Sequence, residues 1–277
     1  MALDLLLSPN FWVNAGADPR RIYRSDTLVL MVLPITARMQ IIYRTEKELF
    51  TDTVARAFKK MPFTCAINCI QYSVTASGVA GAFFGQAVAP GDTTPDGQLV
   101  VQGKVIGGRS APRMFYMVNS AVGGYDFGQG DPPSSAACGV GGIGPMIING
   151  LPYGIGNRCR RPAVCPPSGP IAPGLTEYVQ QRNNATYEAQ ENKVAPVGKT
   201  IVATNKTEGR LLVIVQQNGV SGVKFDQIKE ALLGSGCDNA IFFDGSDSSM
   251  LNVRGAFEIR PGSRKDATNT VGLAFYV

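Results

Sequence analysis

The residues best suited to chemistry lie in the segment AIFFDGSDSSMLNVRG, Ala240 to Gly255. Four apolar residues, typical of a buried strand, are followed directly by Asp244 and a turn rich in serine. Such a strand would hold the Asp244 carboxylate rigidly, Gly245 would let the chain turn sharply, and nearby hydroxyls would bind sugar hydroxyls or phosphate oxygens. Those hydroxyls belong to Ser246, Ser248 and Ser249. The alternative is an Asp-Gly turn in a β-hairpin leading to MLNVRG, and spacing alone does not decide between the two.

The chain contains no histidine, which excludes several catalytic designs. Ser-His-Asp triads, zinc sites of the HExxH type and histidine general bases all require that residue. Asp247 provides a second carboxylate in the turn and could act as a general acid or base, or as a solvated turn residue without a role in chemistry. No cofactor is expected, although Asp244 and Asp247 could together bind a divalent cation.

The six cysteines do not form the paired C-x-x-C pattern of a structural zinc site, so we expect no such site. Cys159 and Cys165 bracket a short loop that contains proline, NRCRRPAVCPP. A disulfide would form there in an oxidising compartment, whereas two thiols would persist in a reducing one. The sequence leaves these two states open.

Length and composition favour one domain over residues 1–277, since a chain with 44% hydrophobic residues can bury a large core. The net charge of +5 is spread along the chain, so nucleic acid is not an expected partner. LVLMVLPIT is much shorter than the roughly 20 residues of a membrane span. MALDLLLSPN lacks the features of a signal peptide, so we expect synthesis in the cytoplasm, with any export by a non-standard route.

The elements expected to position Asp244 lie in the last third of the chain. RLLVIVQQ and AIFF predict buried strands, and KFDQIKEALLGSG predicts a helix with one apolar face made of Phe225, Ile228, Ala231 and Leu232. This β-α-β order predicts that the two strands are neighbours at the centre of a mixed sheet, with the helix on one face. Asp244 would then lie just beyond the second strand, where α/β proteins gather ligand-binding groups.

The rest of the chain predicts strands, one helix and long loops. DTLVLMVLP and RMQIIYR predict strands, and EKELFTDTVARAFKKM predicts a helix. Short strands are expected in VAGAFFGQ, GQLVVQGKVIGG and RMFYMVN, and glycine and proline predict loop insertions over 128–142 and 154–196. The predicted fold class is therefore α+β, with a mixed β-sheet core, packed helices, a C-terminal β-α-β unit and long Gly/Pro-rich loop insertions.

Four segments in a fixed order resemble the phosphodiester glycosidase family. They are AINCIQYS, GIGPMIINGLP, GKTIVATN and AIFFDGSDSSMLNVRG, with RLLVIVQQNG and the predicted helix before the last of them. Members of that family show an Ala-Ile-Asn-Gly-Gly-Phe-Phe-like segment, a Gly-Gly-Pro segment, an Arg-Thr segment and an Asn-Leu-Asp-Gly-Gly-Gly-Ser-Ser segment. The resemblance is strongest over residues 63–153 and 197–277 and leaves 154–196 unmatched.

The first two segments carry over in part. Asn68 falls on the family's asparagine, while Cys69 and Ile70 replace glycines, and Gly144 and Pro145 match the Gly-Pro of the second segment. The resemblance implies that Asn68 orients a sugar hydroxyl or a phosphate oxygen through its amide.

The last two segments supply the reactive groups that the resemblance implies. Thr200 matches the family's threonine, and Lys199 replaces its arginine. Lysine keeps the positive charge but cannot form the two parallel hydrogen bonds to phosphate that arginine forms. The final segment keeps four residues and replaces two glycines: Asp244, Gly245, Ser248 and Ser249 match, and Ser246 and Asp247 are the replacements.

The resemblance implies a hydrolase that cleaves a glycosidic bond to phosphate in a sugar phosphodiester or a related glycan or nucleotide-sugar substrate. Asp244 would stabilise an oxocarbenium-like state or activate water, and Lys199 would assist the phosphate leaving group. One alternative is a non-catalytic carbohydrate or sugar-phosphate binding protein on the same fold. Another is a phage or bacterial effector that acts on an envelope glycan or a nucleotide signal. The sugar, the anomeric outcome and the oligomeric state stay open.

Overall fold

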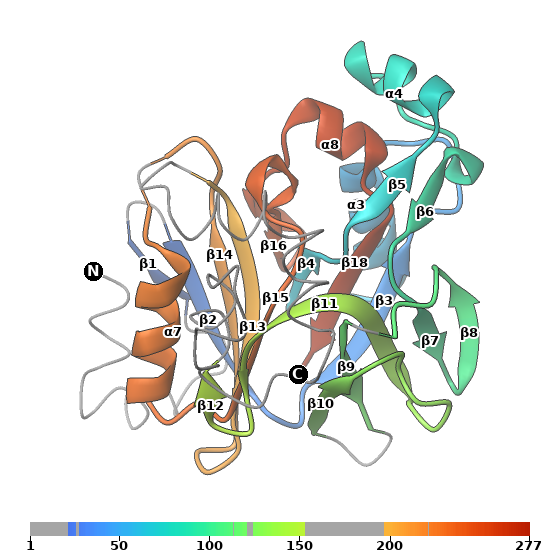
Figure 1. Ribbon diagram of the computed structural model, residues 1–277. Helices are drawn as coiled ribbons and strands as arrows, with labels where there is room; N and C mark the ends of the chain where they lie inside the picture. The colour runs from blue at the N-terminus through green and yellow to red at the C-terminus, as the bar shows by residue number, and fades with distance from the viewer. Residues whose placement is uncertain (1–21, 26–27, 113, 121–123, 153–196, 221) are drawn as a thin grey trace, which may run out of the picture.

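The computed structural model describes residues 22–25, 28–112, 114–120, 124–152, 197–220 and 222–277 (Figure 1). The predicted insertion over 154–196, with Cys159 and Cys165, lies outside the described residues. The insertion predicted over 128–142 does not form one loop, because strand β11 (Cys138–Ile148) begins within it.

The larger of the two main sheets has eleven strands. Its main path runs through β1 (Ile22–Arg24), β2 (Leu28–Pro34), β14 (Arg210–Gln216), β13 (Lys199–Asn205), β15 (Asn239–Phe242), β11, β7 (Leu99–Val101) and β8 (Lys104–Gly107). Two further strands, β9 (Phe115–Asn119) and β12 (Leu151–Pro152), pair with β11, and β10 (Tyr125–Gln129) pairs with β9.

The second main sheet has five strands in the order β17 (Ala256–Ile259), β16 (Leu251–Val253), β4 (Cys65–Asn68), β18 (Val271–Tyr276) and β3 (Arg38–Tyr43). A separate hairpin pairs β5 (Tyr72–Val74) with β6 (Thr93–Pro95). Every strand pair among the described residues is antiparallel.

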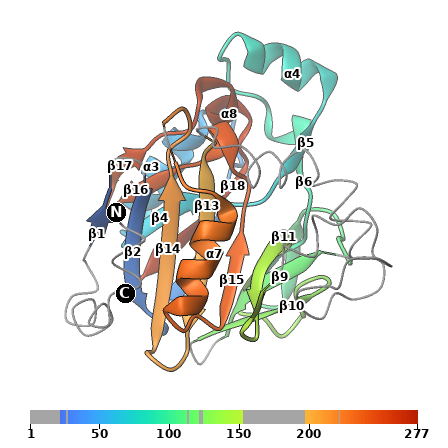
Figure 2. The ribbon, with the colours of Figure 1, turned by 60° about the vertical axis from the view of Figure 1, so that its left-hand side comes forward.

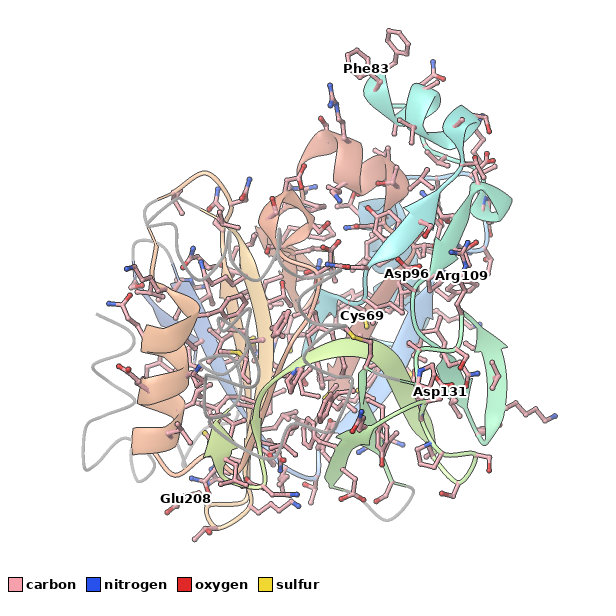
Figure 3. The ribbon with its side chains drawn as sticks, viewed as in Figure 1. Cys69, Phe83, Asp96, Arg109, Asp131 and Glu208 are labelled. Carbon is pink, nitrogen blue, oxygen red and sulfur yellow. The ribbon has the colours of Figure 1, made fainter. Side chains whose placement is uncertain are left out.

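Four α-helices occur in the described part of the chain. Helix α7 (Phe225–Gly234) packs on the outer face of the large sheet (Figure 2), and α3 (Phe50–Lys60) covers the five-stranded sheet. Helix α8 (Ser263–Thr268) contacts α4 (Ala76–Phe83), which projects beyond the sheets with Phe83 at its outer end (Figure 3). No helix among the described residues is both long and apolar enough to cross a membrane.

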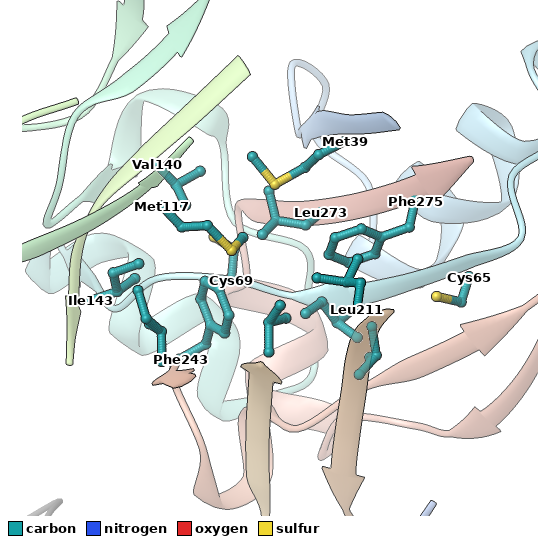
Figure 4. Close-up of a cluster of buried hydrophobic side chains, with 14 of the residues drawn as sticks. Met39, Cys65, Cys69, Met117, Val140, Ile143, Leu211, Phe243, Leu273 and Phe275 are labelled. Atoms are coloured by element: carbon teal, nitrogen blue, oxygen red, sulfur yellow. The ribbon is translucent and has the colours of Figure 1, made fainter. Parts of the chain in front are cut away.

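The main core lies between the two large sheets (Figure 4). Leu211 of the large sheet faces Leu273 and Phe275 of the five-stranded sheet, and Met117 and Phe243 belong to the same buried cluster. The two sheets therefore form a sandwich whose inner faces share one apolar layer. With α7 outside one sheet and α3 outside the other, the layers run helix, sheet, sheet, helix.

Strand β2 explains why apolar residues run continuously along the central strands. Its odd-numbered side chains, such as Met31, lie in the core between the sheets, and its even-numbered ones, such as Leu30, lie under α7. Both faces of the strand are buried, so every position favours an apolar residue. Strand β14 follows the same rule, with Val213 facing the inner core and Ile214 facing α7.

The predicted mixed α+β core with a C-terminal β-α-β unit is wrong. Strands β14 and β15 are not neighbours, because β13 lies between them and pairs antiparallel with both. The error has a physical cause: an antiparallel sheet covered on both faces shows the unbroken apolar runs that are usual in parallel sheets. Helix α7 itself is confirmed, and its predicted stripe is buried: Phe225, Ile228, Ala231 and Leu232.

The strand predicted in VAGAFFGQ is also wrong, because these residues belong largely to helix α4. The Thr75 side chain caps this helix by accepting a hydrogen bond of 3.2 Å from the Gly78 amide. A Cβ at Gly78 would lie 2.7 Å from the Val74 side chain, so glycine allows the helix to pack closely against the hairpin. The strands expected in GQLVVQGKVIGG and RMFYMVN are confirmed as β7, β8 and β9.

Candidate active site

Asp244 follows β15 of the large sheet, in the segment that leads to β16 of the five-stranded sheet. The Asp244 amide donates to the Cys69 carbonyl at 2.9 Å, just beyond β4, and the Phe243 amide donates to the Thr200 carbonyl of β13 at 2.8 Å. The backbone at Asp244 is therefore fixed from both sheets. The residue as a whole is intermediate in exposure, and its carboxylate is buried enough for burial to raise its pKa.

The turn after Asp244 folds tightly against β13 and the start of α8. The Ser246 amide donates to the Gly198 carbonyl at 2.8 Å, and the Gly262 amide donates to the Asp247 carbonyl at 2.7 Å. A Cβ at Gly198 would lie 2.1 Å from the Ser246 carbonyl oxygen, so only glycine permits this approach. The residue with left-handed backbone is Ser246, with a φ of 56°, rather than the expected Gly245, whose φ is −111°.

The Asn68 side chain forms hydrogen bonds to three other residues of the candidate site. Its side-chain amide donates to the Asp244 carbonyl at 2.6 Å, and its side-chain oxygen accepts from the Thr200 hydroxyl at 2.8 Å and the Met250 amide at 3.0 Å. Ser249 lies on the same side, 3.5 Å from the Thr200 hydroxyl. The structure thus brings Asn68, Thr200 and Ser249 together beneath Asp244, where all three are buried.

Lys199 lies on the other face of β13. Side chains alternate along a strand, so Lys199 shares the face of Ile201 beneath α7, while Thr200 faces Asn68. The Lys199 ammonium donates to the Val197 carbonyl at 2.9 Å and lies 5.8 Å from the centre of the Phe225 ring. Burial lowers the pKa of Lys199 to about 8. The structure does not bring this lysine to Asp244.

Lys265 of α8 is the cation that the structure places near Asp244. Burial raises the pKa of Asp244, and the positive charge of Lys265 is the strongest influence that lowers it again. The Lys265 ammonium also lies 5.4 Å from the centre of the Tyr72 ring. The charge of Lys265 therefore acts on the Asp244 carboxylate from α8.

Tyr72 and Ser248 add hydroxyl groups beside the carboxylate. The Tyr72 hydroxyl lies 2.7 Å from that of Thr268, and burial raises the pKa of Tyr72, with the charges of Asp244 and Asp247 acting in the same direction. Ser248 lies within hydrogen-bonding range of both Tyr72 and Asp244, and its buried hydroxyl lowers the pKa of each of them against the larger effect of burial. The hydroxyl of Ser248 thus favours the ionised form of Asp244 from within the fold.

Sequence reasoning missed Tyr72 and Lys265. Tyr72 follows Asn68 by four residues in the AINCIQYS segment, so its proximity could have been inferred from that motif. Lys265 lies in PGSRKDATN, where no spacing relates it to Asp244. Only the contact between the turn and the start of α8 places it in the site.

The carboxylates do not form a larger metal-binding cluster with their neighbours. Among the described residues, no group of three or more histidine, cysteine, aspartate or glutamate side chains could hold a metal ion. The four described cysteines, Cys65, Cys69, Cys138 and Cys237, are buried free thiols. Three cavities of about 520, 430 and 460 Å³ are lined by other residues, mainly around α3 and β3, and none of them includes Asp244.

Comparisons with known proteins confirm the resemblance seen in the sequence. Residues 172–277 match the family model for phosphodiester glycosidase, and this span includes Lys199, Asp244, Asp247 and Lys265. No curated protein sequence matches the chain.

Solved structures show the same fold at low sequence identity. The zebrafish N-acetylglucosamine-1-phosphodiester alpha-N-acetylglucosaminidase catalytic domain, auto-inhibited by its pro-peptide, is 15% identical, with a TM-score of 0.56 over 90% of this chain and 76% of that chain. A Burkholderia pseudomallei K96243 protein of known crystal structure is 11% identical, with a TM-score of 0.53 over 90% of this chain and 74% of that chain.

Proposed function

We propose that the protein is a hydrolase that cleaves the glycosidic bond between a sugar and a phosphate in a glycosyl phosphodiester. The observation that carries the proposal is the junction after β15, where backbone hydrogen bonds fix Asp244 and the positive charge of Lys265 acts on its carboxylate, within the span that matches phosphodiester glycosidases. The likeness in fold to the zebrafish catalytic domain supports the same reaction class.

Asp244 is the carboxylate that we assign to the reacting sugar carbon. Cleavage of a glycosidic bond passes through an oxocarbenium-like state, which a carboxylate stabilises directly or by activating water. The backbone contacts to both sheets hold Asp244 in one position, which favours such a role. Asp247 follows in the same turn and is the second carboxylate available for proton transfer.

Lys265 takes the role of phosphate-binding cation that the sequence assigned to Lys199. Phosphate is already a good leaving group, so neutralising its charge matters more than protonating it. The Tyr72 hydroxyl lies on the same side and can donate to a sugar or phosphate oxygen, whereas Ser248 is buried and acts on Asp244. Asn68 acts through the backbone of Asp244 in this proposal, since its amide and oxygen are bonded to protein groups.

Hydrolysis of a panel of glycosyl phosphodiesters tests the proposal. We expect the wild-type chain to release free sugar from at least one of them, and Asp244→Asn to lower turnover by orders of magnitude. Folding should survive the change. Because burial raises the pKa of Asp244, its contribution to stability is present at low pH and is lost as pH rises through that pKa. Asparagine mimics the protonated acid, so the melting temperature at neutral pH should not fall.

Lys265→Gln should slow turnover by the equivalent of about 2 kcal/mol, because a charge-assisted contact to phosphate is lost. Lys104→Gln, at an exposed lysine of β8, is the matched control and should be as active as wild type. Full activity of Asp244→Asn would remove this carboxylate from the mechanism. Tight binding of sugar phosphates without any hydrolysis by the wild-type chain would favour the non-catalytic binding protein instead.

A further inference from the structure

The outer face of α4 exposes large apolar side chains. Val79 is 56% exposed, Phe83 is 61% exposed and Phe84 is 78% exposed, and the two phenylalanine rings meet edge to face at 5.6 Å. We call Val79, Phe83 and Phe84 the α4 tip. The opposite side of the helix packs its small residue Ala82 against Val88 and Ala267, so the fold leaves the large residues outside.

The α4 tip is uncharged, and a cation lies directly behind it. Residues 76–91 contain no Asp, Glu, Lys or Arg. The carboxylate of Asp92, at the base of the helix, accepts hydrogen bonds from Thr75 and Ser77. The exposed guanidinium of Arg264, on α8, lies 4.2 Å from the centre of the Phe83 ring. Exposed apolar side chains next to a positively charged guanidinium are complementary to a membrane surface with anionic headgroups.

The size and shape of the α4 tip favour a bilayer over a protein partner. Its three side chains expose on the order of 350 Å², whereas a stable protein interface needs about 800 Å² from each partner. The tip is also the outer end of a projecting arm, with Phe83 at its limit (Figure 3). A small aromatic point can enter the headgroup region of a bilayer without needing a shaped partner surface.

We propose that the α4 tip docks the protein on lipid bilayers that carry anionic headgroups. Phe83 and Phe84 enter the boundary between headgroups and acyl chains, and Arg264 pairs with lipid phosphates. Arg264, which contacts the α4 tip, and Lys265, which contacts Tyr72 in the candidate active site, are neighbours on α8. This surface binding needs no catalysis and stands independently of the proposed hydrolase activity.

Co-sedimentation of the full chain with vesicles tests the docking surface. Wild type should sediment with phosphatidylcholine vesicles that contain phosphatidylglycerol, and more weakly with phosphatidylcholine alone. Phe83→Ser combined with Phe84→Ser should weaken binding at least about tenfold, because the apolar insertion is lost. Arg264→Gln should weaken binding to the anionic vesicles more than to phosphatidylcholine alone, because the net negative surface potential is present only in the former. The matched control is Val105→Ser combined with Ile106→Ser, which changes two exposed apolar residues of β8 and should bind as wild type does.

Three results would overturn the proposal. The first is a wild-type chain that sediments with neither kind of vesicle. The second is an equal loss of binding in the tip and β8 variants, which would mean that exposed apolar residues act without regard to position. The third comes from analytical ultracentrifugation without lipid: a wild type that self-associates and a tip variant that stays monomeric would assign the tip to a second copy of the chain.

Discussion

Thr200 and Lys199 are neighbours in the chain, but their side chains lie on opposite faces of β13. Strand alternation makes this separation unavoidable, so a two-residue motif cannot deliver both side chains to one ligand here. Thr200 helps to hold Asn68 beneath Asp244, whereas Lys199 is buried under α7. We therefore expect Lys199 to affect stability and not turnover.

Lys199→Met tests this assignment. Burial lowers the pKa of Lys199 to about 8, so the folded state disfavours the charged amine, and this penalty is present at pH values below 8. Methionine removes the charge and keeps an apolar chain of similar length, so stability near pH 7 should rise by on the order of 1–3 kcal/mol. The gain should shrink as pH rises from 8 towards the unfolded-state pKa. Denaturant unfolding across that pH range measures it, and a loss of turnover as large as that of Lys265→Gln would return Lys199 to the active site.

At the scale of elements, the turn from Gly245 to Ser249 stores backbone strain. Ser246 has a φ of 56° in a position where the resemblance places a family glycine. Left-handed backbone costs a residue with a Cβ roughly 1–2 kcal/mol, so Ser246→Gly should stabilise the protein by about 0.5–1 kcal/mol after the entropy cost of glycine. Thermal unfolding measures the gain. Ser263→Gly in helix α8 is the control and should lower stability, and an equal response of both variants would show that Ser246 is not strained.

The sequence predicts some elements better than others for identifiable reasons. Helix α7 could be predicted because its buried residues repeat with helical spacing, and β2 and β14 because they are long apolar runs. The neighbours of those strands could not be predicted, since burial on both faces removes the alternation that marks an antiparallel sheet. The sequence of helix α4 predicts a strand instead, because its small apolar residues show no clear helical period.

The same distinction applies to the candidate site. The strand-to-turn motif and the resemblance indicated Asp244, Asn68 and Thr200, and the structure brings these three together. Lys265 could not be found in this way, because its position depends on how α8 packs against the turn. A site residue can be predicted from sequence when a local motif places it in the site. It cannot be predicted in this way when packing between distant segments places it there.

At the scale of the whole molecule, the span that matches phosphodiester glycosidases is not a separate structural unit. Residues 172–277 contribute β13, β14 and β15 to the large sheet and β16, β17 and β18 to the five-stranded sheet. Segments before residue 70 complete both sheets, since β2 pairs with β14, and β3 and β4 both pair with β18. The core between the sheets therefore needs both ends of the chain.

This interleaving predicts that the matched span cannot fold alone. Without β2, strand β14 would expose the backbone groups that pair with it, and without β3 and β4, strand β18 would lose both neighbours. A protein of residues 172–277 should therefore show no cooperative thermal transition and should be digested rapidly by protease, whereas the full chain should unfold in one transition. Circular dichroism and limited proteolysis compare the two. A cooperative transition in the isolated span would identify it as an independent domain and would contradict the prediction of one domain over residues 1–277.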